Sequence, residues 1–362
     1  MSFLLSWLGL RARQPREAAR PHCLPSPPET PDSLSVIDKD EAMEDSKMID
    51  LSKTAKRISQ QILETHAALL TLPDFYPSQK INSLLGALVP LCCETHDHRV
   101  VSQVLENPDI ERILPALRRI CSQSESCLES YWADRIMSLG TNPESCYEAL
   151  MSFPYYENYE QLAWFELQAL RTAKKPKDPV PLKCAFLGSG PLPLSSICLL
   201  EQLQQVSGAK AQVEIYNVDM DGEAIRRSKD LIDKLSYKAD GMYFIHGCAG
   251  SDEIDLGSMD VINLAALAGE TQAEKEHIII NVAKQMKIGA ILVVRSARGL
   301  RTVLYPEFDA QHDSCKEIRQ ILQPLTELHP MNHVVNSAII FRKFDPAVGP
   351  EGYYSTRNPV GK

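Results

Sequence analysis

Several features that classify a protein at once are missing from this sequence. No run of about 18 apolar residues occurs in the 362, so no segment is predicted to span a bilayer as a helix. The ten cysteines form no paired C-x-x-C motif and are too sparse for a small disulfide scaffold, which argues against both a zinc site of that type and a secreted domain. The net charge of −9 lacks the basic excess that a nucleic-acid partner requires. What remains, 44% apolar and 23% charged residues, is typical of a globular protein.

The first 48 residues differ in composition from the rest. Met1–Leu10 is apolar, four arginines follow in the next ten positions, and Pro21–Asp45 is rich in Pro, Ser, Asp and Glu. An Arg-rich, acid-poor start resembles a mitochondrial presequence, but the stretch after it is too polar to bury a core. We therefore predict a disordered tail over residues 1–48 of a cytoplasmic protein, with mitochondrial targeting as the alternative.

Residues 49–176 have the period of an all-helical domain. Ser52 is a suitable N-cap, and Pro115 lies in the first turns of the third helix or kinks it. The apolar stripes predict helices over residues 52–70, 81–92, 109–131, 142–153 and 158–174.

Beyond a polar, Pro-rich linker at residues 175–181, the pattern alternates between strands and helices. Strands are predicted at residues 183–187, 213–218, 242–245, 260–265, 290–294 and 334–342, and helices at 194–206, 222–235 and 272–286. This alternation predicts an α/β fold over residues 177–346, a parallel, doubly wound, Rossmann-like sheet, followed by a flexible tail at 347–362.

A glycine loop joins the first of these strands to its helix. Gly188 and Gly190 allow backbone angles and a close ligand approach that a Cβ would block, with Ser189 and Pro191 completing the turn. Pro193 stands where a dinucleotide-binding loop has its third glycine, which counts against a pyrophosphate ligand.

The second strand ends in two acids. Asp219 stands where such sheets bind ribose hydroxyls, although it lies roughly 30 residues after the loop, and Asp221 is better explained as the N-cap of the next helix. The loop and Asp219 together favour an adenosine without phosphates, and hence S-adenosylmethionine.

The sequence resembles the nicotianamine synthase family. The resemblance covers roughly residues 70–344 and rests on five segments, which are Gly188–Ser196, Phe153–Tyr159, Leu264–Leu267, Val294–Pro306 and Val335–Ser337. It implies that three S-adenosylmethionine molecules give one nicotianamine and three methylthioadenosines. The sulfonium is already an activated leaving group, so neither a metal nor a further cofactor is expected, only positioning of the reactants and removal of a proton from the attacking amine.

The resemblance also implies roles for residues of the helical domain. Glu129, in a Leu-Glu-Ser sequence, matches a glutamate that faces the family's reaction chamber and would be the base, assisted by Tyr155. Without the motif, a solvated helix position beside Glu125 would be the better interpretation. Tyr156 and Tyr159 are further candidates, and all three tyrosines could instead pack between domains.

Other candidates lie at the ends of the later strands. Arg295 could bind a substrate carboxylate bidentately, with Arg298 and Arg301 as rivals and an ion pair with the helical domain as the alternative. Ala265 and Leu267 are expected at the S-adenosylmethionine site together with the glycine loop.

The sequence departs from the family pattern in two places. Arg298 stands where the plant pattern has His, and Gly247–Ala249 stands where an acid is common. Two rival functions remain, a methyltransferase that would release S-adenosylhomocysteine and a catalytically silent binder that acts through partner proteins. A homodimer is left open as the oligomeric state.

Overall fold

The computed structural model describes residues 34–173, 183–207 and 212–349, with side chains from residue 47 onward. The predicted linker, the first 33 residues of the predicted N-terminal tail and most of the predicted C-terminal tail lie outside the described residues.

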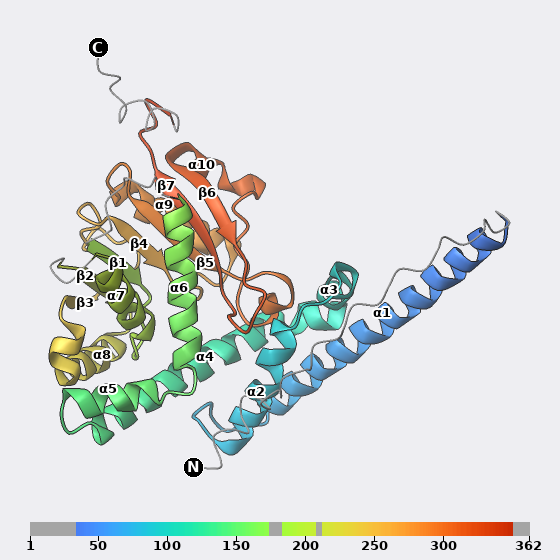
Figure 1. The fold of residues 1–362 in the computed structure, drawn as a ribbon, viewed down its shortest axis with the longest axis horizontal. Coiled ribbons are helices and arrows are strands. Elements are labelled where there is room, and N and C mark those ends of the chain that lie inside the picture. Colours follow the sequence, from blue (N-terminus) through green and yellow to red (C-terminus); the bar gives the residue numbers. More distant parts are fainter. Residues whose placement is uncertain (1–33, 174–182, 208–211, 350–362) are drawn as a thin grey trace, which may run out of the picture.

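The chain begins with a series of helices (Figure 1). They are α1 (Leu34–Leu69), α2 (Gln79–Cys93), α3 (His98–Leu105), α4 (Pro108–Leu139), α5 (Pro143–Met151) and α6 (Tyr156–Ala173). All the helices expected here are present, and only the short α3 was not predicted. Pro115 lies inside α4, which begins at Pro108 behind the N-cap Asn107.

The start of α1 corrects the prediction for the N-terminal tail. The helix begins at Leu34, so Ser52 is an internal position and the expected boundary at residue 48 falls within a helix. Among the described side chains, the apolar ones that α1 buries begin at Ala55. A helix that is nucleated by a packed segment extends at little further cost, because each added residue gains a hydrogen bond. Residues 34–48 are thus helical, whereas the first 33 residues of the predicted tail lie outside the described part of the chain.

A seven-stranded sheet follows, in the order β3-β2-β1-β4-β5-β7-β6. Its strands are β1 (Lys183–Leu187), β2 (Glu214–Asp219), β3 (Met242–His246), β4 (Val261–Leu264), β5 (Ile291–Ser296), β6 (Leu322–Leu328) and β7 (Ser337–Lys343). The first five pair in parallel as predicted, but β7 runs antiparallel to both β5 and β6, so the sheet is mixed. β6 was missed because Pro324 interrupts its pattern, and proline is tolerated there because β6 is an edge strand with a bulge.

Helices cover both faces of the sheet (Figure 1). They are α7 (Leu194–Ser207), α8 (Gly222–Leu235), α9 (Gln272–Gln285) and α10 (Lys316–Ile321), with short 3₁₀ turns η1 (Ser236–Ala239), η2 (Gly299–Val303) and η3 (Asp313–Cys315). Alternate β1 residues enter opposite cores: Cys184 and Phe186 pack with α6, α7 and α8, whereas Ala185 and Leu187 pack with α9 and α10.

The helical segment divides between two cores. Helices α1, α2 and α3 form a third core with η2, and the first half of α4 joins it through Ile110 and Leu117. The second half of α4 enters the sheet's own core through Trp132 and Ile136, as do α5 and α6. Helix α4 therefore passes from one core to the other. Residues between its two packed halves lie near the carboxyl ends of the parallel strands.

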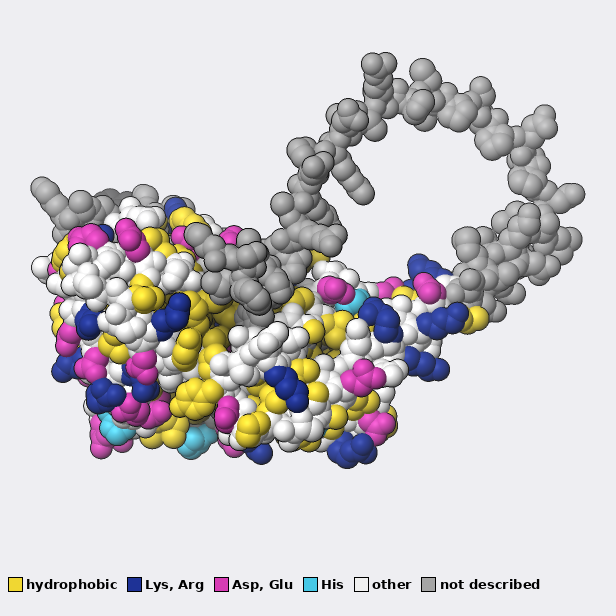
Figure 2. Space-filling model, turned by 90° about the horizontal axis from the view of Figure 1, so that it is seen from below, with side chains coloured by type: hydrophobic (Ala, Val, Ile, Leu, Met, Phe, Trp, Pro, Cys, Tyr) yellow, Lys and Arg dark blue, Asp and Glu magenta, His cyan; other side chains and the backbone are white. Residues whose placement is uncertain are grey.

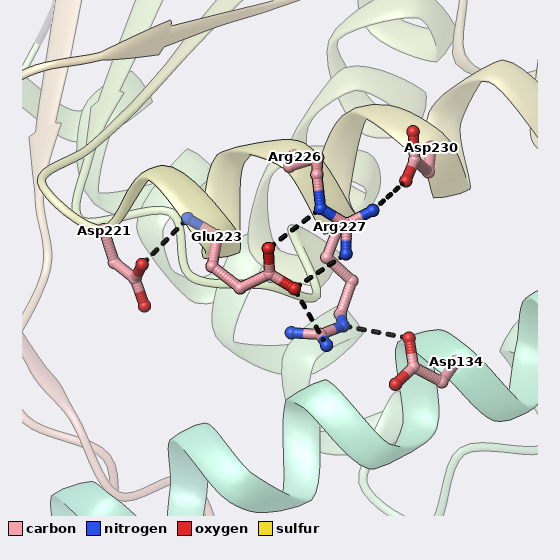
Figure 3. Close-up of polar contacts among 6 residues, drawn as sticks. All are labelled: Asp134, Asp221, Glu223, Arg226, Arg227 and Asp230. Carbon is pink, nitrogen blue, oxygen red and sulfur yellow. Dashed lines mark hydrogen bonds and ion pairs between the residues drawn. The ribbon is translucent and has the colours of Figure 1, made fainter.

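Charged side chains tie α4 to α8 (Figure 3). Arg227 of α8 binds Asp134 of α4 at 2.9 Å and Glu223 of its own helix at 3.1 Å. Arg226 bridges Glu223 and Asp230 along the exposed side of α8. Surface ion pairs of this kind contribute little energy singly, so we assign them to alignment of the two helices rather than to stability.

The described surface carries charges of both signs. On the face in Figure 2, Lys and Arg are interspersed with Asp and Glu, and no continuous basic stripe is visible. Among the described residues, no helix is both long and apolar enough to cross a membrane.

Candidate functional site

The glycine loop after β1 is held by the end of β2. Gly188 and Gly190 have φ values of 86° and 69°, so both positions need glycine. Asp219 accepts hydrogen bonds from the amides of Gly190 (2.8 Å) and Asp221 (2.9 Å), which fixes the loop against the second strand. Asp221 caps α8 as predicted, accepting from the amide of Glu223.

The loop borders an outer cavity of about 500 Å³ at the carboxyl ends of the parallel strands. Most residues predicted for S-adenosylmethionine line it, which are Gly188, Ser189, Gly190, Pro191, Asp219, Ala265, Leu267 and Arg295. A Cβ on Gly188 would lie 2.9 Å from the Cβ of Ala265, so the walls formed by β1 and β4 meet closely here. The structure thus brings these residues together at the sheet edge where open α/β folds bind ligands.

An inner cavity of about 170 Å³ adjoins the outer one. It is lined mainly by apolar side chains of α2, α4 and α6 and of the segments after β5 and before β7. Six residues line both cavities and so mark the junction between them, namely Glu125, Glu129, Tyr159, Arg295, Tyr305 and Asn336. Any reaction between two ligands, one in each cavity, would take place at this junction.

Two carboxylates from consecutive turns of α4 face the junction. Tyr159 donates to Glu129 at 2.9 Å and lies 3.4 Å from Glu125, which also accepts from Tyr305 at 2.8 Å. Burial raises the pKa of both carboxyls, and the neighbouring charge of Glu125 raises that of Glu129 further. Glu129 Oε2 would lie 2.6 Å from a Cβ on Gly190, so this carboxylate directly covers the glycine loop. Glu129 thus lies at the junction of the two cavities with a raised proton affinity.

The predicted tyrosines separate by helix face. Tyr155 lines the inner cavity and packs edge-on against Phe153, and Tyr159, one turn later on α6, lines both cavities. Tyr156 points elsewhere and meets Tyr147 at 3.3 Å. Tyr156 lines neither cavity, because adjacent helical residues point about 100° apart, so the structure does not bring it together with the other predicted residues.

The predicted arginines also separate. Arg295 is buried, binds Glu166 of α6 through two hydrogen bonds (2.6 and 3.0 Å), and donates to Ser195 at 3.0 Å. Burial opposes its ionisation, but the Glu166 carboxylate outweighs this effect and raises the pKa of Arg295. The alternative that the sequence left open, an ion pair with the helical segment, is therefore present. Arg295 still lines both cavities, and its role as a carboxylate clamp stays a prediction.

Neither rival arginine lines the cavities. Arg298 is exposed and approaches Glu327 at 3.4 Å. Arg301 is buried but donates to the backbone carbonyls of Val334, Cys93 and Asn332, joining α2 to the segment before β7. Arg301 is thus engaged in holding the fold, and the structure places neither residue at the cavities with Arg295.

Both the sequence and the fold are similar to those of known proteins. The family described as "Nicotianamine synthase protein" matches residues 51–348. The chain belongs to the nicotianamine synthase family. It is 34% identical to nicotianamine synthase 3 of Oryza sativa subsp. indica over 313 residues, which cover 86% of this chain and 84% of that protein. It is 31% identical to nicotianamine synthase 2 of Arabidopsis thaliana, with 82% and 86% covered.

Solved structures show the same fold. A mutant of MtNAS in complex with S-adenosylmethionine superposes with a TM-score of 0.64 at 19% identity, covering 79% of this chain and 98% of that one. MtNAS in complex with MTA and tNA also gives a TM-score of 0.64, at 21% identity, covering 81% and 98%. The nicotianamine synthase match includes every residue at the junction of the two cavities.

Several junction residues were not predicted as part of this nicotianamine synthase site. Glu125 carried a usable signal, because it lies four residues before Glu129 on the same helix face. Tyr305 and Asn336 stand within the segments that carry the resemblance, but nothing in the sequence aims them at the cavity. Asn336 is 8% exposed, and its side-chain nitrogen has no hydrogen-bond partner among the described residues. A buried donor without a partner is costly, which suggests that it serves a ligand.

Proposed function

We propose that this chain condenses three S-adenosylmethionine molecules into nicotianamine and releases three methylthioadenosines. The observation that carries the proposal is the place of Glu129, a carboxylate of raised pKa that covers the glycine loop at the junction of two cavities. Membership of the family supports the same activity. The chain is accordingly a transferase that uses S-adenosylmethionine.

Each coupling is a displacement at carbon. The α-amine nitrogen of the acceptor forms a bond to the γ-carbon of the donor, the bond from that carbon to sulfur breaks, and its electron pair stays on the sulfur of methylthioadenosine. The proton lost by the amine passes to Glu129. Closure of the azetidine ring is the same displacement within one molecule. The sulfonium leaves readily, so this chemistry calls for alignment and a base and does not require a metal.

The two cavities suit a donor and an acceptor. We place the adenosine of the donor in the outer cavity, between the glycine loop and Asp219. The acceptor's ammonium would lie in the inner cavity beside Glu125 and Glu129. The acceptor's carboxylate would accept a hydrogen bond from the side-chain amide of Asn336. Arg295 would also bind this carboxylate if its ion pair with Glu166 rearranged. Tyr155 and Tyr159 would complete the wall on the α6 side.

The released thioether is the first test. Incubation of the purified chain with S-adenosylmethionine is expected to yield methylthioadenosine and nicotianamine, identified by mass spectrometry. The matched control is the same protein carrying Glu129→Gln. Release of S-adenosylhomocysteine would instead identify a methyltransferase, and release of neither thioether would identify a silent binder.

The compartment is a separate part of the proposal. We expect a cytoplasmic enzyme whose product, a chelator with several carboxylates and amines, serves metal homeostasis. A fluorescent fusion of Met1–Asp45 is expected to stay diffuse in the cytosol. Removing the same segment is expected to leave activity and the thermal midpoint nearly unchanged, because the part of the chain that matches the family begins only at residue 51. Accumulation of the fusion in mitochondria would contradict the cytoplasmic assignment.

A further inference from the structure

A buried lysine lies beneath the wall of the outer cavity and takes no part in the chemistry proposed above. Lys275, in the first turns of α9, is 1% exposed. Its ammonium donates to the backbone carbonyl of Ala266 at 2.6 Å and lies 3.3 Å from that of Arg295 and 3.4 Å from that of Ala265. Burial lowers its pKa to about 7.

The carbonyls that Lys275 holds belong to the chain as it leaves β4 and β5. Ala265 also accepts from the amide of Ala268 at 3.2 Å, so the segment after β4 forms a tight turn around the ammonium. Ala265, Ala266, Leu267 and Ala268 all line the outer cavity. Lys275 therefore acts on the cavity wall from behind, without reaching the cavity itself.

The hydrogen bond from Lys275 to the Ala266 carbonyl also fixes the direction of the next N–H, that of Leu267. In a planar trans peptide the C=O and N–H bonds point in opposite directions, and no cis peptide is present among the described residues. The Ala266 carbonyl accepts from Lys275, so the N–H of Leu267 in the same peptide unit points away from the ammonium, and Leu267 lines the outer cavity. Within the described part of the chain this amide has no hydrogen-bond acceptor. An unpaired amide on a cavity wall is a donor available to a ligand.

We propose that Lys275 is a positioning residue, which orients the peptide between Ala266 and Leu267 so that its N–H donates to S-adenosylmethionine in the outer cavity. The inference rests on the proposed function only in taking that cavity as the S-adenosylmethionine site. It concerns ligand affinity, so it can be tested whatever product the chain releases.

The first test replaces the ammonium with an apolar group of similar length. Lys275→Met frees the Ala266 carbonyl to turn, and the Kd for S-adenosylmethionine, measured by calorimetry, is expected to rise about tenfold, the effect of one or two lost hydrogen bonds. KM is expected to rise in parallel while kcat stays within about twofold, because the lost contact is equal in ground and transition states. Ile279→Ala, one turn later on α9 and fully buried, is the matched control, since it weakens the same helix without touching the cavity wall. It is expected to lower the thermal midpoint and leave Kd unchanged.

A second pair of variants applies even if Lys275→Met does not fold. Leu267→Pro deletes the N–H itself and leaves Lys275 in place, whereas Leu267→Ala keeps the N–H and shortens the side chain. The proline variant is expected to bind S-adenosylmethionine about tenfold more weakly than the alanine variant, because both lack the leucine side chain and only the alanine variant keeps the N–H. Wild-type affinity in folded Lys275→Met or in Leu267→Pro would overturn the inference, as would an equal loss in Ile279→Ala. Failure of the wild-type chain to bind S-adenosylmethionine would instead overturn the proposed function.

Discussion

Replacing Glu129 with Gln is expected to lower the coupling rate about 10²–10⁴-fold while S-adenosylmethionine binding stays near wild type. The amide keeps the shape of the side chain and an acceptor for the Tyr159 hydroxyl, which lies 2.9 Å away, but it cannot take a proton. The attacking amine arrives mostly protonated at neutral pH, so the loss falls on the chemical step. Single-turnover measurements of methylthioadenosine release, together with calorimetric binding, would separate the two effects.

The coupling rate of the wild type and of Glu129→Gln is expected to depend on pH in different ways. The pKa of Glu129 is raised by burial and by Glu125, so its basic form accumulates only as pH rises through that raised value. The wild-type rate is therefore expected to increase with pH on its acid side, and the defect of Glu129→Gln to shrink at high pH, where more of the amine is free. Glu125→Gln removes the neighbouring charge, lowers the pKa of Glu129 and should move the acid limb to lower pH. Wild-type turnover of Glu129→Gln at neutral pH would place the base elsewhere, with Tyr155 or Glu125 next.

The same raised pKa has a consequence for stability. The folded protein holds the Glu129 proton to a higher pH than the unfolded chain does. The associated stability is thus complete below the ordinary pKa of a glutamate and is lost as pH rises through the raised folded value. Glu129→Gln cannot ionise and should be more heat-stable than the wild type at neutral pH. Such a gain would also exclude misfolding as the reason for its lost activity.

Replacing Asp219 with Ala is expected to weaken S-adenosylmethionine binding by roughly 1.5–3 kcal/mol, or about 10- to 150-fold in Kd, without unfolding the protein. The carboxylate holds the amides of Gly190 and Asp221, and it lines the outer cavity where the ribose hydroxyls are placed. The substitution thus removes a charged acceptor for the ribose and a support of the glycine loop. Asp230→Ala, on the exposed side of α8, is the matched control and should bind normally.

A ligand that lacks one hydroxyl separates the two roles of Asp219. The wild type should bind methylthioadenosine more tightly than its 2′-deoxy analogue, whereas Asp219→Ala should bind the two nearly alike, because the partner of the missing hydroxyl is already gone. If folded Asp219→Ala keeps wild-type affinity, the ribose assignment is wrong. If the variant still discriminates fully between the two ligands, Asp219 supports the loop only.

The parts of the site that could be predicted from the sequence are those set by local geometry. The glycine loop follows from adjacent residues at one strand–helix junction, Asp219 and the N-cap Asp221 from the next such junction, and Glu129 from a short motif. The partner of Arg295 could not be predicted in this way, because Glu166 reaches it only when α6 packs on the sheet, 129 residues away along the chain. Tyr156 could not be separated from Tyr155 and Tyr159, because the motif does not specify where the first turn of α6 begins.

The same distinction between local pattern and tertiary packing applies to the prediction of the fold. Five parallel strands and the helices between them have strong periodic patterns and were predicted. β6 was not, because an edge strand with a proline and a bulge has little periodicity of its own. The extension of α1 back to Leu34 depends on propagation of the helix from its packed half, which hydrophobic content does not reveal.

The course of α4 through two cores bears on how this protein can lose activity. Its first half is packed by α1, α2 and η2 and its second half by the sheet, and the carboxylates of Glu125 and Glu129 lie between. Partial unfolding of the N-terminal helices would remove the packing around the first half of α4 while the sheet and the glycine loop of the outer cavity stayed folded. The protein would then retain a ligand it could no longer convert, so heat inactivation would precede loss of binding, and the helical half would limit the working temperature of the enzyme.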